Sequence, residues 1–299
     1  MQKVKKKIGI AISIISLLSV LIVGGLIFTN RAPQSSQYGL EDFLQITNSG
    51  SGWDFHSSIS NDGNKVCFAR FNPTTSKMSL NIYSIPDGNL TTVVSTMTGD
   101  FSSTWSPDDT QIAFDARATA DSTSYIYILT IATGEIVRFS SLSGNAFRPD
   151  WSHDGQNIVY VSYLQLYIQP VSGGDAKLVP NADEAVNPTW NHDDTQILFS
   201  KENAAKDIYS INVDGSNLKF LAKGNSNDKE SWARWSNDGT QIIYHLFDDG
   251  ISSIAIKNLT SEKVSLLTDI GDCRFPDWSA DGSLIVFSYD TNLWIFSFS

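Results

Sequence analysis

The chain has 299 residues with 21 basic and 32 acidic side chains, a formal net charge of −11, and 41% hydrophobic residues. Five of the basic residues and no acidic one lie in residues 1–31, so residues 32–299 carry a net charge of −16. A surface this acidic repels phosphate backbones and anionic lipid head groups, which excludes nucleic-acid binding; it would favour basic partners or metal cations, although solubility alone also explains it.

The N-terminal region contains one long uncharged stretch, residues 8–28, which follows four lysines. As a helix with a rise of about 1.5 Å per residue, it would cover roughly 30 Å, the thickness of a bilayer core. We expect residues 1–31 to be a signal anchor with the N-terminus in the cytoplasm, because Lys and Arg residues that flank a membrane helix tend to remain on its cytoplasmic side. A cleaved signal peptide is the alternative, but there is no clear cleavage site of small residues. Residues 32–39 are polar and predict a linker.

Six copies of one pattern follow: an aromatic or aliphatic residue, a short polar turn that contains Asp, and a run of β-branched and aromatic residues. The copies occupy residues 59–68, 105–114, 151–160, 190–199, 235–244 and 278–287. In the fifth copy, Trp235 ends an apolar strand, the Ser-Asn-Asp-Gly stretch favours a tight reversal, and Ile242 lies in the next strand. Asp109 and Asp194 replace Gly in two copies, and Asp is among the few residues that tolerate the left-handed region. Each copy predicts a β-hairpin.

The copies are spaced by 46, 46, 39, 45 and 43 residues, a period typical of four-stranded propeller blades. An apolar pair after each hairpin marks a third strand, and a Gly-containing turn often precedes the fourth. The sixth copy ends after its third strand, and residues 40–48 resemble the fourth strands of the other copies. The sequence therefore predicts an all-β, six-bladed β-propeller of four-stranded blades over residues 40–299, closed by an N-terminal strand.

The six Trp-Ser-x-Asp-Gly-x-x-Ile-x-Phe/Tyr copies and the Ile-Tyr pairs after them resemble the TolB-like branch of WD-type propellers over residues 40–299. The resemblance implies a fold and not a function, because the motif residues belong to hairpins and core. TolB carries an α/β domain before its propeller, where this chain has the predicted anchor and linker. Related propeller peptidases add an α/β-hydrolase domain, and the absence of a Gly-x-Ser-x-Gly sequence here argues against a peptidase.

Two faces of the predicted ring differ. The turns between first and second strands and between third and fourth strands lie on one face, the hairpin-turn face. The second-to-third connections and the blade-to-blade segments lie on the other, the loop face, where connection lengths vary and recognition sites are usual. Polar blade-to-blade residues there predict a ligand-binding rim, although solvated loops and packing between blades are the alternatives. The rim residues are Asp54, His56, Asn145, Arg148, Glu184, Asn187, Glu230, Trp232, Asp272 and Arg274.

No metal site is expected. His153 and His192 share one turn position in adjacent copies, but we expect equivalent turns of neighbouring blades to diverge, and no third ligand is apparent. Asp in each turn already has a turn-forming role. Cys67 and Cys273 fall near opposite ends of their blades, which favours two buried thiols over a disulfide.

With no recognisable catalytic set, we expect no catalytic residue and no cofactor. The favoured function is a protein- or peptide-binding module, a monomeric propeller held outside the cytoplasm by its N-terminal membrane helix, with a component of the cell envelope as a candidate partner. A carbohydrate-active lyase or hydrolase with its site at the channel mouth is the alternative. It would need a convergent cluster of carboxylates, His or Arg with a metal.

Overall fold

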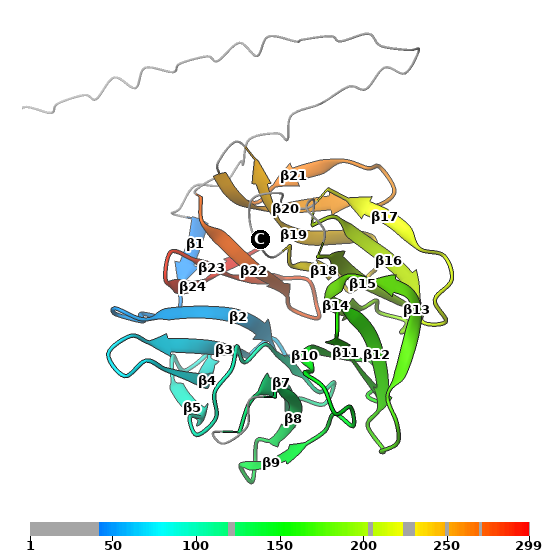
Figure 1. Cartoon of the computed structure of the whole chain (residues 1–299). Coiled ribbons are helices and arrows are strands. Elements are labelled where there is room, and N and C mark those ends of the chain that lie inside the picture. The colour runs from blue at the N-terminus through cyan, green and yellow to red at the C-terminus, as the bar shows by residue number, and fades with distance from the viewer. Residues whose placement is uncertain are drawn as a thin grey trace, which may run out of the picture. The chain divides into compact units, whose positions relative to one another are not determined.

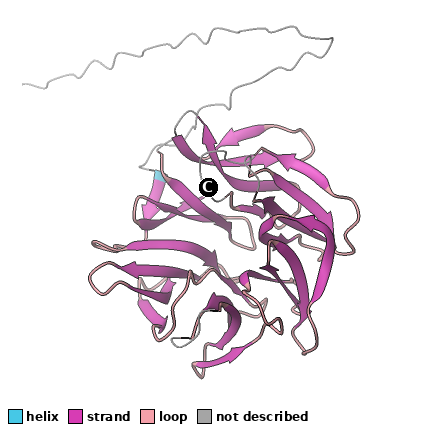
Figure 2. Ribbon diagram, in the orientation of Figure 1, coloured by secondary structure: helices cyan, strands magenta, loops and turns pink. Residues whose placement is uncertain are grey.

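The computed structural model describes residues 42–118, 123–202, 206–223, 231–248, 251–268 and 271–298. These residues form twenty-four strands in six four-stranded sheets arranged as the blades of a ring (Figure 1). Figure 2 shows that strands dominate the regular structure of this region. The predicted six-bladed propeller is confirmed. The expected anchor and linker lie outside the described residues, and within those residues no helix has the length and apolar character needed to cross a membrane.

Each blade is an antiparallel sheet whose strands follow one another in sequence, except in blade six. Blades one to three contain β2 (Trp53–Ile59), β3 (Lys65–Asn72), β4 (Lys77–Ser84) and β5 (Leu90–Val94); β6 (Ser103–Trp105), β7 (Gln111–Ala116), β8 (Tyr125–Thr130) and β9 (Glu135–Arg138); and β10 (Phe147–Trp151), β11 (Asn157–Ser162), β12 (Gln165–Pro170) and β13 (Lys177–Asp183). Blades four to six contain β14 (Ala185–Trp190), β15 (Gln196–Lys201), β16 (Ile208–Asn212) and β17 (Lys219–Ala222); β18 (Ala233–Trp235), β19 (Gln241–Asp248), β20 (Ile251–Asn258) and β21 (Val264–Leu266); and β22 (Cys273–Trp278), β23 (Leu284–Tyr289), β24 (Asn292–Ser297) and β1 (Phe43–Gln45).

The turn of each hairpin copy is held by its own side chains, Ser and Asp in five copies and Asn191 with Asp193 in blade four. In blade five, the Ser236 hydroxyl donates to the Asp238 carboxylate at 2.7 Å and accepts the Gln241 N–H at 3.0 Å. Gly239 donates its N–H to the Ser236 carbonyl at 2.9 Å and has a φ of 67°, which glycine adopts without a side-chain clash. Asp109 and Asp194 occupy the same position with φ of 57°. The turn chemistry predicted from the sequence is confirmed.

The ring is closed by the predicted N-terminal strand. β1 pairs with β24, with Phe43 opposite Phe296 and Gln45 opposite Trp294. Beyond β1, the Thr47 hydroxyl accepts the buried N–H of Leu293 at 2.9 Å. The first strands of the blades contact one another around the whole ring, from β2 through β6, β10, β14 and β18 to β22 and back to β2. These six innermost strands surround the central channel.

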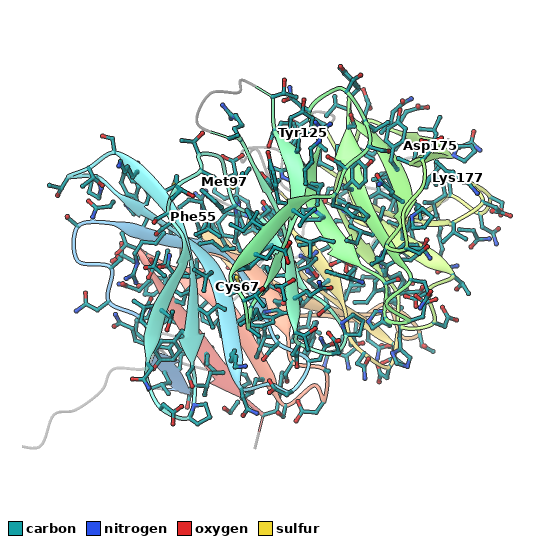
Figure 3. The ribbon with its side chains drawn as sticks, turned by 90° about the horizontal axis from the view of Figure 1, so that it is seen from below. Phe55, Cys67, Met97, Tyr125, Asp175 and Lys177 are labelled. Carbon is teal, nitrogen blue, oxygen red and sulfur yellow. The ribbon has the colours of Figure 1, made fainter. Side chains whose placement is uncertain are left out.

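The hydrophobic core lies within the blades and between neighbouring blades. Four of the six residues that begin the hairpin copies, Ile59 and Trp105 among them, are buried, while Trp235 and Trp278 are half-buried. Cys67 lies in the cluster shared by blades one and two with Phe55, Met97 and Tyr125, all labelled in Figure 3. Cys67 and Cys273 are buried in separate clusters and form no disulfide with each other, as predicted.

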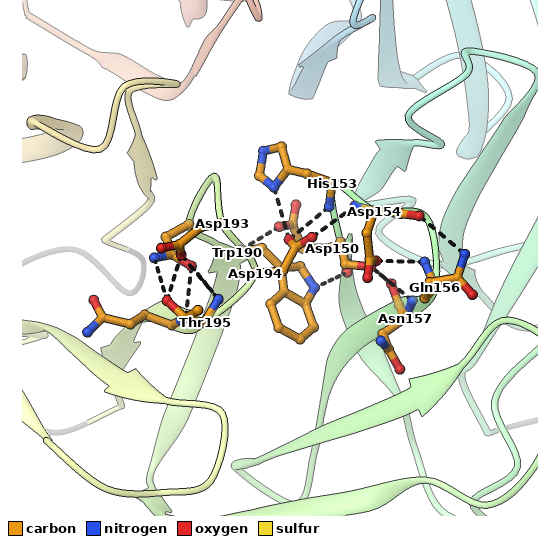
Figure 4. A network of polar contacts seen from close by, with 12 residues as sticks. Asp150, His153, Asp154, Gln156, Asn157, Trp190, Asp193, Asp194 and Thr195 are labelled. Carbon is orange, nitrogen blue, oxygen red and sulfur yellow. Dashed lines mark hydrogen bonds and ion pairs between the residues drawn. The ribbon is translucent and has the colours of Figure 1, made fainter.

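Two carboxylates in the turns join neighbouring blades. Asp194 of blade four accepts the backbone N–H of His153 at 2.9 Å and of Asp154 at 2.8 Å, both in blade three (Figure 4). Asp109 of blade two accepts the N–H groups of two turn residues of blade one in the same way. In both copies that have Asp in place of Gly, that Asp therefore bonds to the turn of the preceding blade.

Candidate functional site

The central channel is lined by the residue that precedes the leading Trp or Ile in each copy. Successive side chains of a strand point to opposite sides, so the leading residue packs into the blades and its predecessor faces the channel. All six predecessors are polar, and together with the six leading residues and parts of the hairpin turns they border a cavity of about 120 Å³. These residues, which we call the channel ring, are Ser58, Thr104, Asp150, Thr189, Arg234 and Asp277.

Two carboxylates and one guanidinium give the channel ring its charge. The Arg234 Nε lies 3.5 Å from the Asp277 Oδ1. Burial raises the pKa of Asp277 to about 6, and the positive charge of Arg234 opposes this rise. Burial also raises the pKa of Asp150, again opposed by Arg234. Each carboxylate accepts a backbone N–H from the next blade, Ile59 for Asp277 and Trp190 for Asp150. The ring charges therefore help to hold the blades together.

The hairpin turns converge at the channel, which corrects the expectation that they diverge. The rings of His153 and His192 are 5.4 Å apart, and both residues border the 120 Å³ cavity. The turns lie at the ends of the innermost strands, where neighbouring blades are closest together. His153 Nδ1 lies 3.1 Å from the Asp194 carboxylate. Among the described residues there is still no group of three His, Cys, Asp or Glu side chains placed to hold a metal ion.

At the loop face, the residue three positions before each leading residue surrounds the channel mouth. These positions hold His56, Ser102, Arg148, Asn187, Trp232 and Phe275. In blades one, three, four and six this residue has a positive φ of 53–55° at an irregularity in the pairing of the first two strands. Such bulges redirect a side chain from the regular strand alternation. A cavity of about 10 Å³ lies here, bordered by five of the six residues.

Trp232 is the centre of an aromatic and cationic cluster at this mouth. Its ring lies 5.0 Å from that of His56 and 5.3 Å from that of Phe275. The guanidinium carbons of Arg148 and Arg234 lie 5.3 and 5.9 Å from the ring centroid, within the range of cation–π attraction. Trp232 itself is only 6% exposed, so it packs at the mouth rather than projecting from it.

The structure brings together three of the predicted rim residues, His56, Arg148 and Trp232, around the small cavity. Asn187 is buried nearby and donates its side-chain amide to the Ser231 carbonyl at 3.1 Å. Asp54 is buried in a two-bond ion pair with Arg70 at 2.6 and 2.7 Å, away from the cavity lining.

The other predicted rim residues lie outside the cavity lining. Asn145, Glu184 and Asp272 are exposed, and Arg274 pairs with Asp272 at 3.1 Å. Glu230 lies outside the described residues. The predicted rim therefore divides into a small central cluster and surrounding loop residues.

Sequence reasoning missed the channel ring and Phe275. A signal for the ring was present, because the position before the leading residue is polar in every copy while the leading residue is apolar in every copy. Phe275 lies at the same copy position as Trp232, but as an apolar residue it does not stand out in a search for polar rim residues. Only the bulge in β22 shows that it borders the mouth.

The profile of the family described as TolB beta propeller domain matches residues 55–234, well over half of the chain. The chain belongs to the TolB beta propeller family. Among solved structures, TolB from Acinetobacter baumannii is similar at a TM-score of 0.61 and 19% identity, over 80% of this chain and 65% of that one. A protein from Agrobacterium tumefaciens, provisionally named TolB, has a TM-score of 0.66 and 17% sequence identity, over 86% of this chain and 97% of that one. At these identities the likeness shows the fold alone.

Two proteins of other descriptions are also similar to parts of this chain. An oligogalacturonate lyase solved in complex with manganese has a TM-score of 0.56 at 16% identity, over 82% of this chain and 73% of that one. The "Uncharacterized peptidase YuxL" of Bacillus subtilis strain 168 is 28% identical over 206 residues, which is 62% of this chain but 28% of the Bacillus protein. The chain thus spans less than a third of that relative and 65% of the Acinetobacter structure.

Proposed function

We propose that this TolB-type propeller is a binding module that holds a protein or peptide at the loop-face mouth of its channel. The observation that carries the proposal is the cluster of His56, Arg148, Trp232 and Phe275 around one small cavity. Aromatic and Arg side chains are the residues that most often dominate the energy of protein interfaces. Variable loops surround this cluster, whereas the hairpin-turn face repeats the same short turns.

We further propose that the module is anchored to a membrane by residues 8–28 and acts outside the cytoplasm, where a component of the cell envelope would be its partner. The support is the sequence: a stretch of 21 uncharged residues after four lysines, followed by a polar linker. The domain division that we propose is 1–31 for the anchor, 32–39 for the linker and 40–299 for the propeller.

The experiment is affinity capture of partners from membranes with the intact chain, using variants at the mouth. Arg148→Gln and His56→Gln should each lower partner recovery several-fold, and Trp232→Ala should lower it most. Because Trp232 is buried, its variant needs a melting curve to show that it is folded. Trp53→Ala is the matched control, since Trp53 is 49% exposed, stacks on Phe71 at 5.2 Å and does not border the cavity. Full recovery with every mouth variant would contradict the proposal.

The carbohydrate-active alternative is supported by one observation, the buried Asp150 and the half-buried Arg234 and Asp277 in a channel cavity of about 120 Å³. Paired carboxylates with raised pKa values suit acid–base chemistry on sugars. However, both carboxylates already accept backbone N–H groups of neighbouring blades. Turnover of oligosaccharides that is lost in Asp277→Asn, with folding retained, would favour this alternative over the binding module.

A further inference from the structure

The turn between β11 and β12 of blade three holds two bulky residues in an unfavourable backbone conformation. Tyr163 and Leu164 are the only residues of this turn, and their φ angles are 50° and 59°. Two-residue hairpin turns with positive φ at both positions favour Asn-Gly, because bulky side chains crowd the backbone in this region. The corresponding turn of blade six begins with Asp290 at a φ of 57°, a residue type that tolerates such an angle. Blade three therefore carries strain that blade six avoids.

Tyr163 and Leu164 are also exposed, by 76% and 43%. Such strain persists only where something compensates for it, and two exposed side chains gain little from the core of the fold. Strained residues concentrate at binding sites and active sites, where the unusual conformation is used. As a second-to-third connection, this pair lies on the loop face, and we call it the blade-three tip. Its strain and its exposure together indicate contact with another molecule.

The blade-three tip is held from both neighbouring blades. The Leu164 carbonyl accepts the N–H of Ala185, at the start of β14 in blade four, at 2.8 Å. The Tyr163 ring lies so close to Gly144 that a Cβ on this glycine would fall 2.4 Å from the tyrosine hydroxyl oxygen. Beside the glycine, the Asn145 side chain accepts a backbone N–H of blade two at 2.8 Å. Because the fold already fixes the backbone of the tip, its binding to a partner costs little conformational entropy.

We propose that the blade-three tip inserts into an apolar pocket of a different protein, and that Lys or Arg residues edge this pocket. A turn that projects from the surface cannot enclose a ligand, so the concave surface belongs to the partner. Tyr is among the residues that most often dominate the energy of interfaces. This inference rests on the proposed binding function; it gives the loop face a second contact and specifies the chemistry of the partner.

The charge beside the tip indicates the basic edge of the partner's pocket. Asp183 lies opposite Gln165, the residue that follows the tip, and Glu184 precedes the Ala185 that bonds to it. Both carboxylate residues are exposed, whereas Lys201, opposite Ala185, is half-buried with its ammonium 5.3 Å from a tyrosine ring. Residues 32–299 carry a net charge of −16 in addition. Complementary charge around the partner's pocket would fix its orientation and speed its association.

The double substitution Tyr163→Asn with Leu164→Gly separates a binding role from a structural one. It supplies the residues that this turn prefers, so the melting temperature should rise by about 2–5 °C while partner binding is lost. A pair retained for the fold would behave in the opposite way, because its removal would lower the melting temperature. Val137→Asn is the matched control, since it removes a side chain of β9 that is 55% exposed and should leave binding unchanged.

Binding is measured by photocrosslinking with the purified full chain in a detergent extract of its native cells. Tyr163→p-benzoylphenylalanine keeps an aromatic ring at the tip. We expect one adduct with a different protein, joined at an apolar surface site beside Lys or Arg, in a yield that falls as salt is added. Unlabelled parent chain should suppress this adduct, and the Asn-Gly variant should need about tenfold or more of the parent's concentration to do so.

Several results would overturn the proposal: suppression by the Asn-Gly variant at the parent's concentration, a lower melting temperature of that variant, a yield independent of salt, an adduct with a second copy of the chain, or no adduct. Trp232→Ala, used as a third competitor, distinguishes these results from failure of the proposed function. If the Asn-Gly variant suppresses the adduct and Trp232→Ala does not, the mouth binds the partner and the tip does not. If both suppress it as well as the parent chain does, binding at the mouth is rejected too.

Discussion

The carboxylate of Asp109 accepts the backbone N–H of Asn61 at 2.8 Å, although the two residues belong to different blades and lie 48 positions apart in sequence. The second oxygen of Asp109 accepts the N–H of Asp62 at 2.9 Å. This pair of bonds is repeated by Asp194 with His153 and Asp154. Asp at the Gly position of the turn therefore does more than tolerate a positive φ, because its carboxylate bonds to the neighbouring blade.

Asp109→Gly should lower the free energy of unfolding by about 1–2 kcal/mol. The variant loses three hydrogen bonds to a charged acceptor, two from Asn61 and one from Asp62, and the easier positive φ of glycine offsets only part of that loss. Urea denaturation is the measurement, with exposed Asp175→Gly as the control. Asp109→Gly and Asp194→Gly should be additive, because the two contacts join different blade pairs. Unchanged stability in the double variant would show that these bonds contribute nothing.

Deletion of residues 40–48 should leave the propeller unable to form a soluble, cooperatively melting domain. The deletion removes β1, exposes the edge of β24 and takes away the Thr47 hydroxyl that accepts the Leu293 N–H. Size-exclusion chromatography and a thermal melt are the measurements. Thr47→Val is a milder variant that should fold with stability reduced by about 1–3 kcal/mol. A monomeric deletion variant with a sharp melt would refute the role of β1 in closure.

Stability should fall as the pH rises from about 4 to 6, because Asp115 and Asp277 each have a folded-state pKa raised to about 6, against about 3.9 when unfolded. In this window the folded state binds more protons than the unfolded state, so the free energy of unfolding decreases with pH, by on the order of 2 kcal/mol per group. Asp277→Asn keeps an acceptor for Ile59 and cannot ionise, so it should remove its own share of the slope and leave the shares of Asp115 and of Asp150, whose pKa burial also raises.

Urea midpoints measured across this pH range test the prediction, with Asp175→Asn as an exposed control. The turn carboxylates Asp62, Asp108, Asp193, Asp238 and Asp281 have pKa values lowered by their Ser, Thr and backbone donors. Their contribution is lost progressively as the pH falls from about 5 through those lowered values, so it opposes the predicted slope at the acidic end of the window, and the comparison with Asp277→Asn separates the two effects. If the pH dependence of stability is the same in Asp277→Asn and in the parent chain, Asp277 is not its source.

The full chain should fractionate with membranes and should be released by deletion of residues 1–31. Such a release would follow from the loss of the uncharged stretch 8–28, and the deletion leaves β1 and its pairing with β24 in place. Membrane flotation is the measurement, and the intact mass of the purified protein distinguishes an anchor from a cleaved signal peptide. A full-length chain that stays in the soluble fraction would rule out the anchor.

The sequence predicted the blades well because the residues that form each hairpin lie close together within one copy. The Ser and Asp of the turn, the Gly or Asp at positive φ and the β-branched run after Ile242 act within a few residues of one another. Closure by residues 40–48 was also predictable, since the last copy lacks a strand that another segment resembles.

The site was less predictable because it depends on how blades converge. His153 and His192 lie in different blades, and nothing within either turn indicates that their rings are 5.4 Å apart. Likewise, the bulges that place His56, Arg148 and Phe275 at the mouth arise from the pairing of two strands and have no residue type of their own. Position in the copy, rather than residue type, is the better guide to which side chains face the channel.

Arg234 borders both cavities of the channel, with Asp277 on one side and Trp232 on the other. One guanidinium thus belongs to both ends of the channel, so a change at this position reaches both cavities at once. Replacing Arg234 by Gln would alter both linings and would remove the positive charge that opposes the rise in the Asp277 pKa caused by burial.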